Sequence, residues 1–200
     1  MTLPVQPQPR PAHPLRRALA TWGAIAALLW AILLADFVIP AHLTQYGIVP
    51  RTLEGLVPGI LAAPFLHADA AHLAANTVPL VVMGVICALR DRRGMWAALA
   101  VSLVASGLGV WLISPAHSVT VGASGVVFGL LGYLLARGVF MRRIGDLLIA
   151  LLVFAVYGSL IWGVLPTSPY VSWQAHLFGF LGGVAAAIAV ARTRRAAAAA

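Results

Sequence analysis

Long apolar runs separated by short polar segments dominate the 200-residue chain. The runs lie at residues 22–39, 72–89, 95–113, 124–140, 144–164 and 172–191. As helices rising ~1.5 Å per residue, most of them are long enough to cross a bilayer core of about 30 Å. The pattern therefore predicts an all-α, polytopic membrane protein with a bundle of six transmembrane helices.

The first two runs are joined by a long connection over residues 40–71, which is rich in proline. Its apolar piece at 56–66 is too short and too broken to span a membrane. We expect this first loop to be partly embedded in the membrane.

Three parts of the chain are predicted. Residues 1–19 form a flexible, Pro-rich N-terminal segment, residues 20–191 form the membrane domain, and residues 192–200 form a short tail. A cleaved signal peptide is the alternative interpretation of the first apolar run. The length of that run and the spans that follow it favour a retained helix.

Composition supports the membrane interpretation. The chain is 62% hydrophobic and 9% charged, with a mean hydropathy of +0.96, whereas soluble chains carry about 25% charged residues. This balance excludes an ordinary soluble domain and a disordered protein. The single cysteine, Cys87, excludes an internal disulfide and a thiolate metal cluster.

The positive charge indicates orientation. The net charge of +8 comes from 13 arginines and no lysine, and twelve of the arginines fall on one side of the predicted spans, with Arg51 alone on the other. By the positive-inside rule, both termini lie in the cytoplasm of a multi-pass protein of the cell (inner) membrane. The lipid bilayer is thus an expected partner, and nucleic acid is not. Arg51 and Glu54 are interpreted as a local structural pair.

Polar side chains stand near the start of each span that runs inward. His72 and Asn76 share one helix face in the second span, Ser124 opens the fourth, and His176 lies one turn into the sixth. Polar groups at this depth are costly unless they have partners, so they are candidates for a functional site.

Glycine spacing suggests how these residues meet. Gly125 and Gly129 form one G-x-x-x-G pair, and Gly179 and Gly183 form another on the face of His176. Small residues at this spacing let helix backbones approach closely. If the fourth and sixth spans pack through these faces, Ser124 and His176 come within hydrogen-bond reach.

A serine beside an imidazole base is an activated nucleophile. No carboxylate lies at this depth, so the pattern favours a Ser–His dyad for acyl transfer. The N–H groups at the start of the Ser124 helix, with Asn76 and His72, are candidate donors to an oxyanion. No cofactor and no metal ion are expected.

Three alternatives remain for these residues. Each motif alone is more often a packing or capping feature than a catalytic one. A metal-dependent hydrolase using His67, His72 and His176 has only a weak ligand spacing in its favour. A small transporter predicts an inverted repeat, which the chain does not display.

Together the motifs resemble those of the rhomboid intramembrane serine proteases. They are Pro64-Phe65-Leu66-His67, His72-Leu73-Ala74-Ala75-Asn76, Gly122-Ala123-Ser124-Gly125, and Ala175-His176-Leu177-Phe178-Gly179 with Gly183. The resemblance covers most of residues 20–191 and implies the compact six-helix bacterial type.

The resemblance implies roles for these residues. Ser124 is the nucleophile, His176 the general base, and His72, Asn76 and the Ser124 N–H the oxyanion site. Gly122, Gly125, Phe128, Gly179 and Gly183 shape the site. Phe128 stands where family members often have a tyrosine whose ring packs on the catalytic histidine, and His67 is given a structural use.

The implied activity is endopeptidase cleavage in or near the transmembrane segment of single-span membrane proteins, through an acyl-enzyme. The alternative is a catalytically inactive rhomboid-like protein that binds or chaperones membrane proteins. Such relatives usually lack one member of the dyad, whereas this chain has both.

Overall fold

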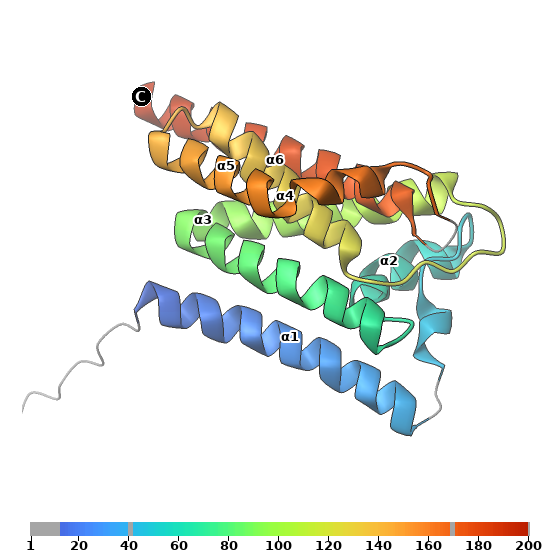
Figure 1. The fold of residues 1–200 in the computed structure, drawn as a ribbon. Coiled ribbons are helices and arrows are strands. Elements are labelled where there is room, and N and C mark those ends of the chain that lie inside the picture. The colour runs from blue at the N-terminus through green and yellow to red at the C-terminus, as the bar shows by residue number, and fades with distance from the viewer. Residues whose placement is uncertain (1–12, 40–41, 169–170, 200) are drawn as a thin grey trace, which may run out of the picture.

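The computed structural model describes residues 13–39, 42–168 and 171–199. Long helices run along one common direction and form a bundle (Figure 1). They are α1 (Pro14–Val38), α3 (Ala70–Ile113), α4 (Ser124–Phe140), α5 (Ile144–Tyr157) and α6 (Trp173–Ala199). We call the end of the bundle where α1 begins and α6 ends the basal end. The opposite end, where α1 ends and α6 begins, is the groove end.

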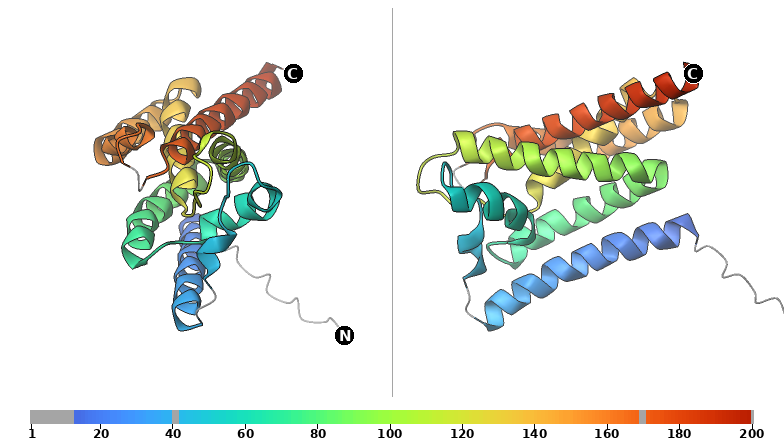
Figure 2. Two further views of the ribbon diagram at one scale, coloured as in Figure 1. Left: turned by 90° about the vertical axis from the view of Figure 1, so that its right-hand side faces the viewer. Right: turned by 180° about the vertical axis from the view of Figure 1, so that it is seen from behind.

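Helix α3 contains two of the predicted spans. Its backbone leaves the helical conformation at Asp91 (φ −166°, ψ 92°), and the chain reverses direction there (Figure 2). The arms on either side correspond to the predicted runs at 72–89 and 95–113. Within the described residues there are thus six long helical segments, as the hydrophobic pattern predicts.

Four of the described helices are long and apolar enough to cross a membrane: α1, α3, α6, and α5 with its continuation η4 (Gly158–Val164). Helix α4 is apolar but has only 17 residues. It is buried along most of its length, packed between α3, α5 and α6. The bundle is a helical membrane protein with α4 at its centre.

The helix boundaries differ from the prediction at both ends of the chain. Helix α1 begins at Pro14, inside the segment expected to be flexible, because proline suits the first helical turn and His13 Nδ1 accepts from Leu15 N (3.4 Å). Residues 1–12 lie outside the described residues. Helix α6 continues through the expected tail to Ala199, as alanine and arginine are strong helix formers.

The first loop folds against the groove end as short turns: η1 (Leu43–Tyr46), η2 (Gly55–Gly59), α2 (Ile60–Ala62) and η3 (Ala63–Phe65). Ile48 pairs with Thr120 through two backbone hydrogen bonds of 2.9 and 3.0 Å. The expected pairing of Arg51 with Glu54 is wrong. Instead, the Arg51 guanidinium donates to Leu112 O (3.2 Å) and Ser114 O (2.9 Å), which otherwise lack helical partners at the end of α3.

Helices α4 and α6 touch backbone to backbone through the two glycine pairs. A β-carbon on Gly179 would overlap the carbonyl of Gly125, and one on Gly183 would overlap the carbonyl of Gly129. This contact is the one that the spacing predicts. It holds the first turns of the two helices, which carry Ser124 and His176, beside each other.

Candidate active site

A groove with a cavity volume of about 840 Å³ opens at the groove end of the bundle. Its walls come from α3, α4, the start of α6 and the segments that precede these helices. Ser124, His176, His72 and Asn76 all line it. The four polar residues singled out from the sequence are therefore brought together by the fold.

The turn before Ser124 is fixed from two sides. Gly122 has φ +117°, which favours glycine, and a β-carbon there would lie 2.7 Å from His72 Nε2. Its N–H donates to Ala63 O (2.8 Å). The next N–H, that of Ala123, donates to His67 Nε2 (3.3 Å). The first loop and α3 thus set the position from which α4 starts.

Ser124 is the first residue of α4, and its side chain is partly exposed to the groove. Within the described residues, the N–H groups of Ser124 and Gly125 have no hydrogen-bond acceptor. Free N–H groups and the helix dipole together favour negative charge at this point. The start of α4 can therefore stabilise an anion next to the serine hydroxyl.

The His176 ring is held between two groups. It stacks on Phe128 with ring centroids 4.0 Å apart and planes 6° apart, and its Nδ1 lies 2.9 Å from Gly163 O. The histidine is 8% exposed. In the described part of the chain, no hydrogen bond joins His176 to the Ser124 hydroxyl, and such bonds are often loose where no substrate is bound.

His72 and Asn76 sit on the first turns of α3. Asp69 caps this helix by accepting from His72 N (2.7 Å), and Asn76 Nδ2 donates to His72 O (3.1 Å). The 3.8 Å between Asn76 Nδ2 and a β-carbon built on Gly122 puts the amide next to the Ser124 turn. Asn76 is therefore placed beside the anion site at the start of α4.

His67 packs edge-on against His72, with ring centroids 5.0 Å apart. Burial, with a smaller contribution from His72, lowers the pKa of His67 to about 4. At neutral pH the His67 ring is therefore uncharged and able to accept the Ala123 N–H. No group of three His, Cys, Asp or Glu side chains among the described residues is arranged to hold a metal ion.

Comparison with known proteins identifies the family. The model of the Rhomboid domain matches residues 55–193. The chain belongs to the rhomboid family. An uncharacterized protein of Mycobacterium tuberculosis is 40% identical over 178 residues, which cover 84% of this chain and 73% of that protein. The Bacillus subtilis protein named "Putative rhomboid protease YdcA" is 31% identical, over 80% of this chain and 81% of its own length.

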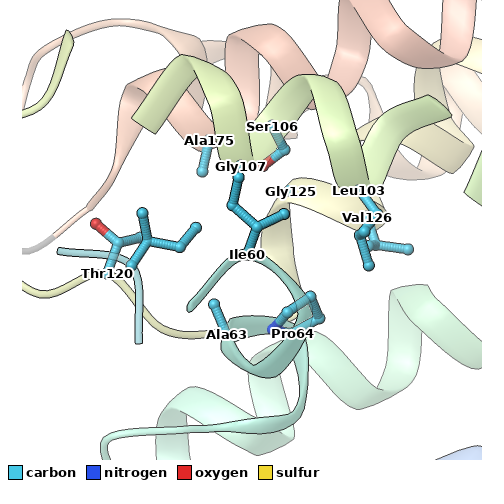
Figure 3. A pocket seen from close by; sticks show the side chains of 12 residues that line it. Ile60, Ala63, Pro64, Leu103, Ser106, Gly107, Thr120, Gly125, Val126 and Ala175 are labelled. Carbon is cyan, nitrogen blue, oxygen red and sulfur yellow. The ribbon is translucent and has the colours of Figure 1, made fainter. Parts of the chain in front are cut away.

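A second, much smaller cavity of about 20 Å³ lies in this rhomboid between α2, the second arm of α3 and Gly125 (Figure 3). Ile60, Leu103 and Val126 form much of its wall, and Ser106 is a polar member. A volume of this size holds about one water molecule. It is too small for a peptide side chain, so the large groove is the only one of these two cavities that can admit a polypeptide.

Two contacts of the rhomboid site were not expected from the sequence. The carbonyl of Gly163 belongs to a residue that the hydrophobic pattern places in the fifth span, and nothing in that pattern points to His176. His67 was expected to have a structural role, and the bond that it accepts from Ala123 N shows which contact it makes.

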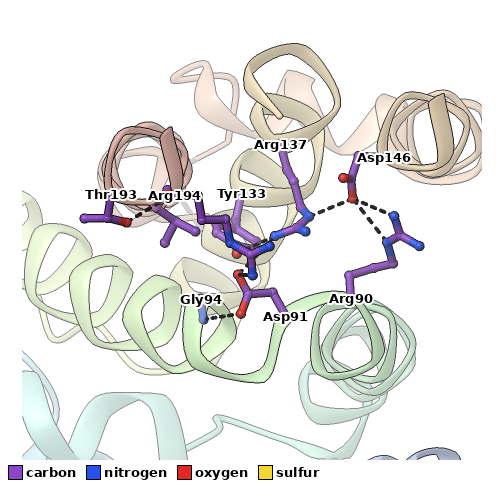
Figure 4. A network of polar contacts seen from close by, with 9 residues as sticks. Arg90, Asp91, Gly94, Tyr133, Arg137, Asp146, Thr193 and Arg194 are labelled. Atoms are coloured by element: carbon purple, nitrogen blue, oxygen red, sulfur yellow. Dashed lines mark hydrogen bonds and ion pairs between the residues drawn. The ribbon is translucent and has the colours of Figure 1, made fainter. Parts of the chain in front are cut away.

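The basal end holds a second polar cluster, the basal charge cluster (Figure 4). Arg137 of α4 donates from Nε to Asp146 of α5 (2.8 Å) and from Nη1 to Asp91 of α3 (3.2 Å). Arg90 and Arg194 complete it: Arg90 Nη2 is 3.0 Å from Asp146 Oδ1, and Arg194 Nη2 is 2.7 Å from Asp91 Oδ2. The cluster ties the basal ends of four helices together.

Proposed function

We propose that this rhomboid is an intramembrane serine endopeptidase that cleaves single-span membrane proteins in or near their transmembrane segments. The observation that carries the proposal is the start of α4. There the Ser124 hydroxyl, the free Ser124 N–H group and the His176 imidazole border one groove.

In the proposed reaction, Ser124 Oγ attacks the carbonyl carbon of the scissile bond while His176 Nε2 accepts the hydroxyl proton. The negative charge that develops on the carbonyl oxygen is stabilised by the Ser124 N–H, Asn76 and His72. His176 then gives the proton to the leaving amine, and the C–N bond breaks. Water hydrolyses the resulting Ser124 ester by the same steps in reverse order.

We further propose that the protein crosses the membrane several times with both termini in the cytoplasm. The exposed Arg16, Arg92, Arg142 and Arg192 all lie towards the basal end, and cytoplasmic segments carry an excess of arginine. The groove then opens near the outer leaflet. Hydroxyl groups of Ser118, Thr120 and Thr167 line it and give water a path to the ester.

The test is cleavage of a single-span reporter protein by the purified rhomboid in lipid vesicles. Ser124→Ala and His176→Ala should each abolish cleavage. Ser102→Ala is the matched control, because Ser102 is buried in the bundle away from the groove and its hydroxyl has no hydrogen-bond partner within the described residues. Cleavage that survives Ser124→Ala would refute the mechanism.

A fluorophosphonate probe separates the protease from an inactive, membrane-protein-binding relative. The probe reacts with an activated serine, so the protease should be labelled on Ser124. A wild-type protein that binds the reporter but is neither labelled nor able to cleave it would favour the binding function.

A further inference from the structure

Gly163 presents a backbone carbonyl to the imidazole of His176. A carbonyl oxygen only accepts hydrogen bonds, so at 2.9 Å it requires the proton of the neutral ring to be on Nδ1. Nε2 is then left with the lone pair that a general base needs. The contact therefore selects the tautomer in which His176 can accept a proton from Ser124.

The absence of a side chain at Gly163 is what allows this contact. A β-carbon there would lie 2.9 Å from Phe128 Cζ and 3.0 Å from His176 Nδ1. Both distances are shorter than ordinary contacts, and they involve the two rings that stack on each other. Any larger residue at this position pushes the backbone away from the imidazole or the imidazole away from Phe128.

The segment that carries Gly163 is less deeply buried than the helix that precedes it. None of the seven residues of η4 is buried, and Trp162 is 68% exposed. By contrast, α5 is anchored nearer its basal end by Asp146 and Val153, which are each 1% exposed. Leu160 of η4 packs partly against the core and also borders the groove. The carbonyl that orients His176 thus sits on the less buried end of this helix.

We propose that Gly163 is a positioning residue for His176. The docking of η4 against α6 then determines whether the imidazole is oriented to accept the proton of Ser124. This inference rests on the proposed protease function. The carbonyl takes the place that a buried carboxylate has in a Ser–His–Asp triad. When η4 moves away from α6, the imidazole loses its acceptor and Nε2 is no longer fixed towards Ser124. Chemistry is then confined to the state in which η4 is docked.

The direct test compares Gly163→Ala with Gly158→Ala in the purified full-length protein in lipid vesicles. Gly158 begins the same segment, and the atoms nearest to a methyl group there belong to the ring of Phe154, an exposed side chain. For Gly163→Ala, we expect the rate of fluorophosphonate labelling and kcat for the reporter to fall about 100-fold. KM should change little, because the groove walls remain. Gly158→Ala should stay near wild type.

Nitrogen-15 NMR of the histidine side chains gives a readout that needs no activity. His176 in the wild-type protein should be the Nδ1-protonated tautomer, and Gly163→Ala should show a mixture of the two. A single Nδ1-protonated form in both proteins, or equal labelling rates for Gly163→Ala and Gly158→Ala, would overturn the positioning role.

A second variant keeps the proposal testable if Gly163→Ala does not fold. Leu160→Ala loosens η4 without adding an atom near His176, and Leu151→Ala on the exposed face of α5 is its control. Leu160→Ala should lower the labelling rate several-fold and broaden the His176 signals, and an unchanged rate with unchanged signals would contradict the proposal. Failure of the proposed function looks different: the wild type itself would not be labelled, while the NMR result would still decide the orientation of His176.

Discussion

The two polar clusters of the bundle lie at opposite ends of α4 and are built in opposite ways. In the basal charge cluster, Arg137 and Asp146 are 2% and 1% exposed and satisfy each other's charge. In the groove, the hydroxyl and the N–H of Ser124 have no partner among the described residues, and Ser124 faces a cavity of about 840 Å³. Paired buried charge holds helices together, whereas polar groups kept free in an apolar protein indicate a reactive site.

The comparison predicts that the largest loss of stability follows from breaking the basal charge cluster. Arg137→Met removes the common partner of Asp91 and Asp146 and leaves them with the more exposed Arg194 and Arg90, so we expect a loss of about 3 kcal/mol of unfolding free energy. Unfolding in mixed detergent micelles measures this. Arg143→Met, at the exposed N-cap position of α5, should change it by less than about 0.5 kcal/mol. The kcat of folded Arg137→Met should stay near wild type. A variant with full stability and reduced kcat would contradict the structural role assigned to the basal charge cluster.

Substitutions in the groove should lower kcat and leave the unfolding free energy nearly unchanged. Asn76→Ala removes a candidate oxyanion donor, so kcat for the reporter should fall about 10²–10³-fold with little change in the unfolding free energy. Among the described residues, the Asn76 amide bonds only within its own helix, to His72 O, which is why its loss costs little stability. Thr77→Ala, the neighbouring position outside the groove, should keep kcat. Equal kcat for the two variants would remove Asn76 from the oxyanion site.

The spans and the glycine contacts could be predicted from the sequence because both follow from local spacing. The run at 124–140 is α4 from its first residue to its last. The two glycine pairs face each other because a four-residue spacing fixes one side of a helix. The shared depth of Ser124, His176 and His72 followed from the direction of each span, so the groove residues were also within reach of the sequence.

The basal charge cluster could not be predicted in this way. Counting arginines treats Arg137 as one more positive charge near the membrane surface, whereas in the fold it is buried and binds two aspartates from other helices. The Gly163 carbonyl is likewise invisible, because every residue has a carbonyl and only the fold brings this one to His176. Contacts of this kind, which no spacing motif marks on either partner, depend on the packing of distant segments.

The glycine contacts between α4 and α6 lie between the basal charge cluster and the groove. Disturbing them should have an intermediate effect on both the unfolding free energy and kcat. In Gly183→Ala the added methyl group overlaps the carbonyl of Gly129, so we expect a loss of about 1–3 kcal/mol of unfolding free energy. Because Ser124 and His176 are carried by these helices, kcat should fall as well. Gly23→Ala in α1 has open space around the new methyl group and should instead stabilise by about 0.5–1 kcal/mol. Equal stability of the two variants would contradict the close contact.

The last predicted effect is a pH dependence of stability at the groove end. His67 has a pKa of about 4 in the fold and about 6.5 in an unfolded chain. Between these values the unfolded state binds more protons, so the unfolding free energy falls as the pH is lowered from 6.5 to 4 and levels off below that.

His67→Gln should flatten this part of the pH profile, because glutamine does not titrate yet still offers an oxygen to the Ala123 N–H that His67 accepts. His117→Asn is the control: His117 is exposed, and asparagine tolerates its φ of +67°. Unfolding free energies measured at pH 7, 5.5 and 4.5 compare the two variants with wild type. If His67→Gln follows the wild-type profile, the acid sensitivity arises elsewhere, and the neutral ring of His67 is not what holds the Ser124 turn.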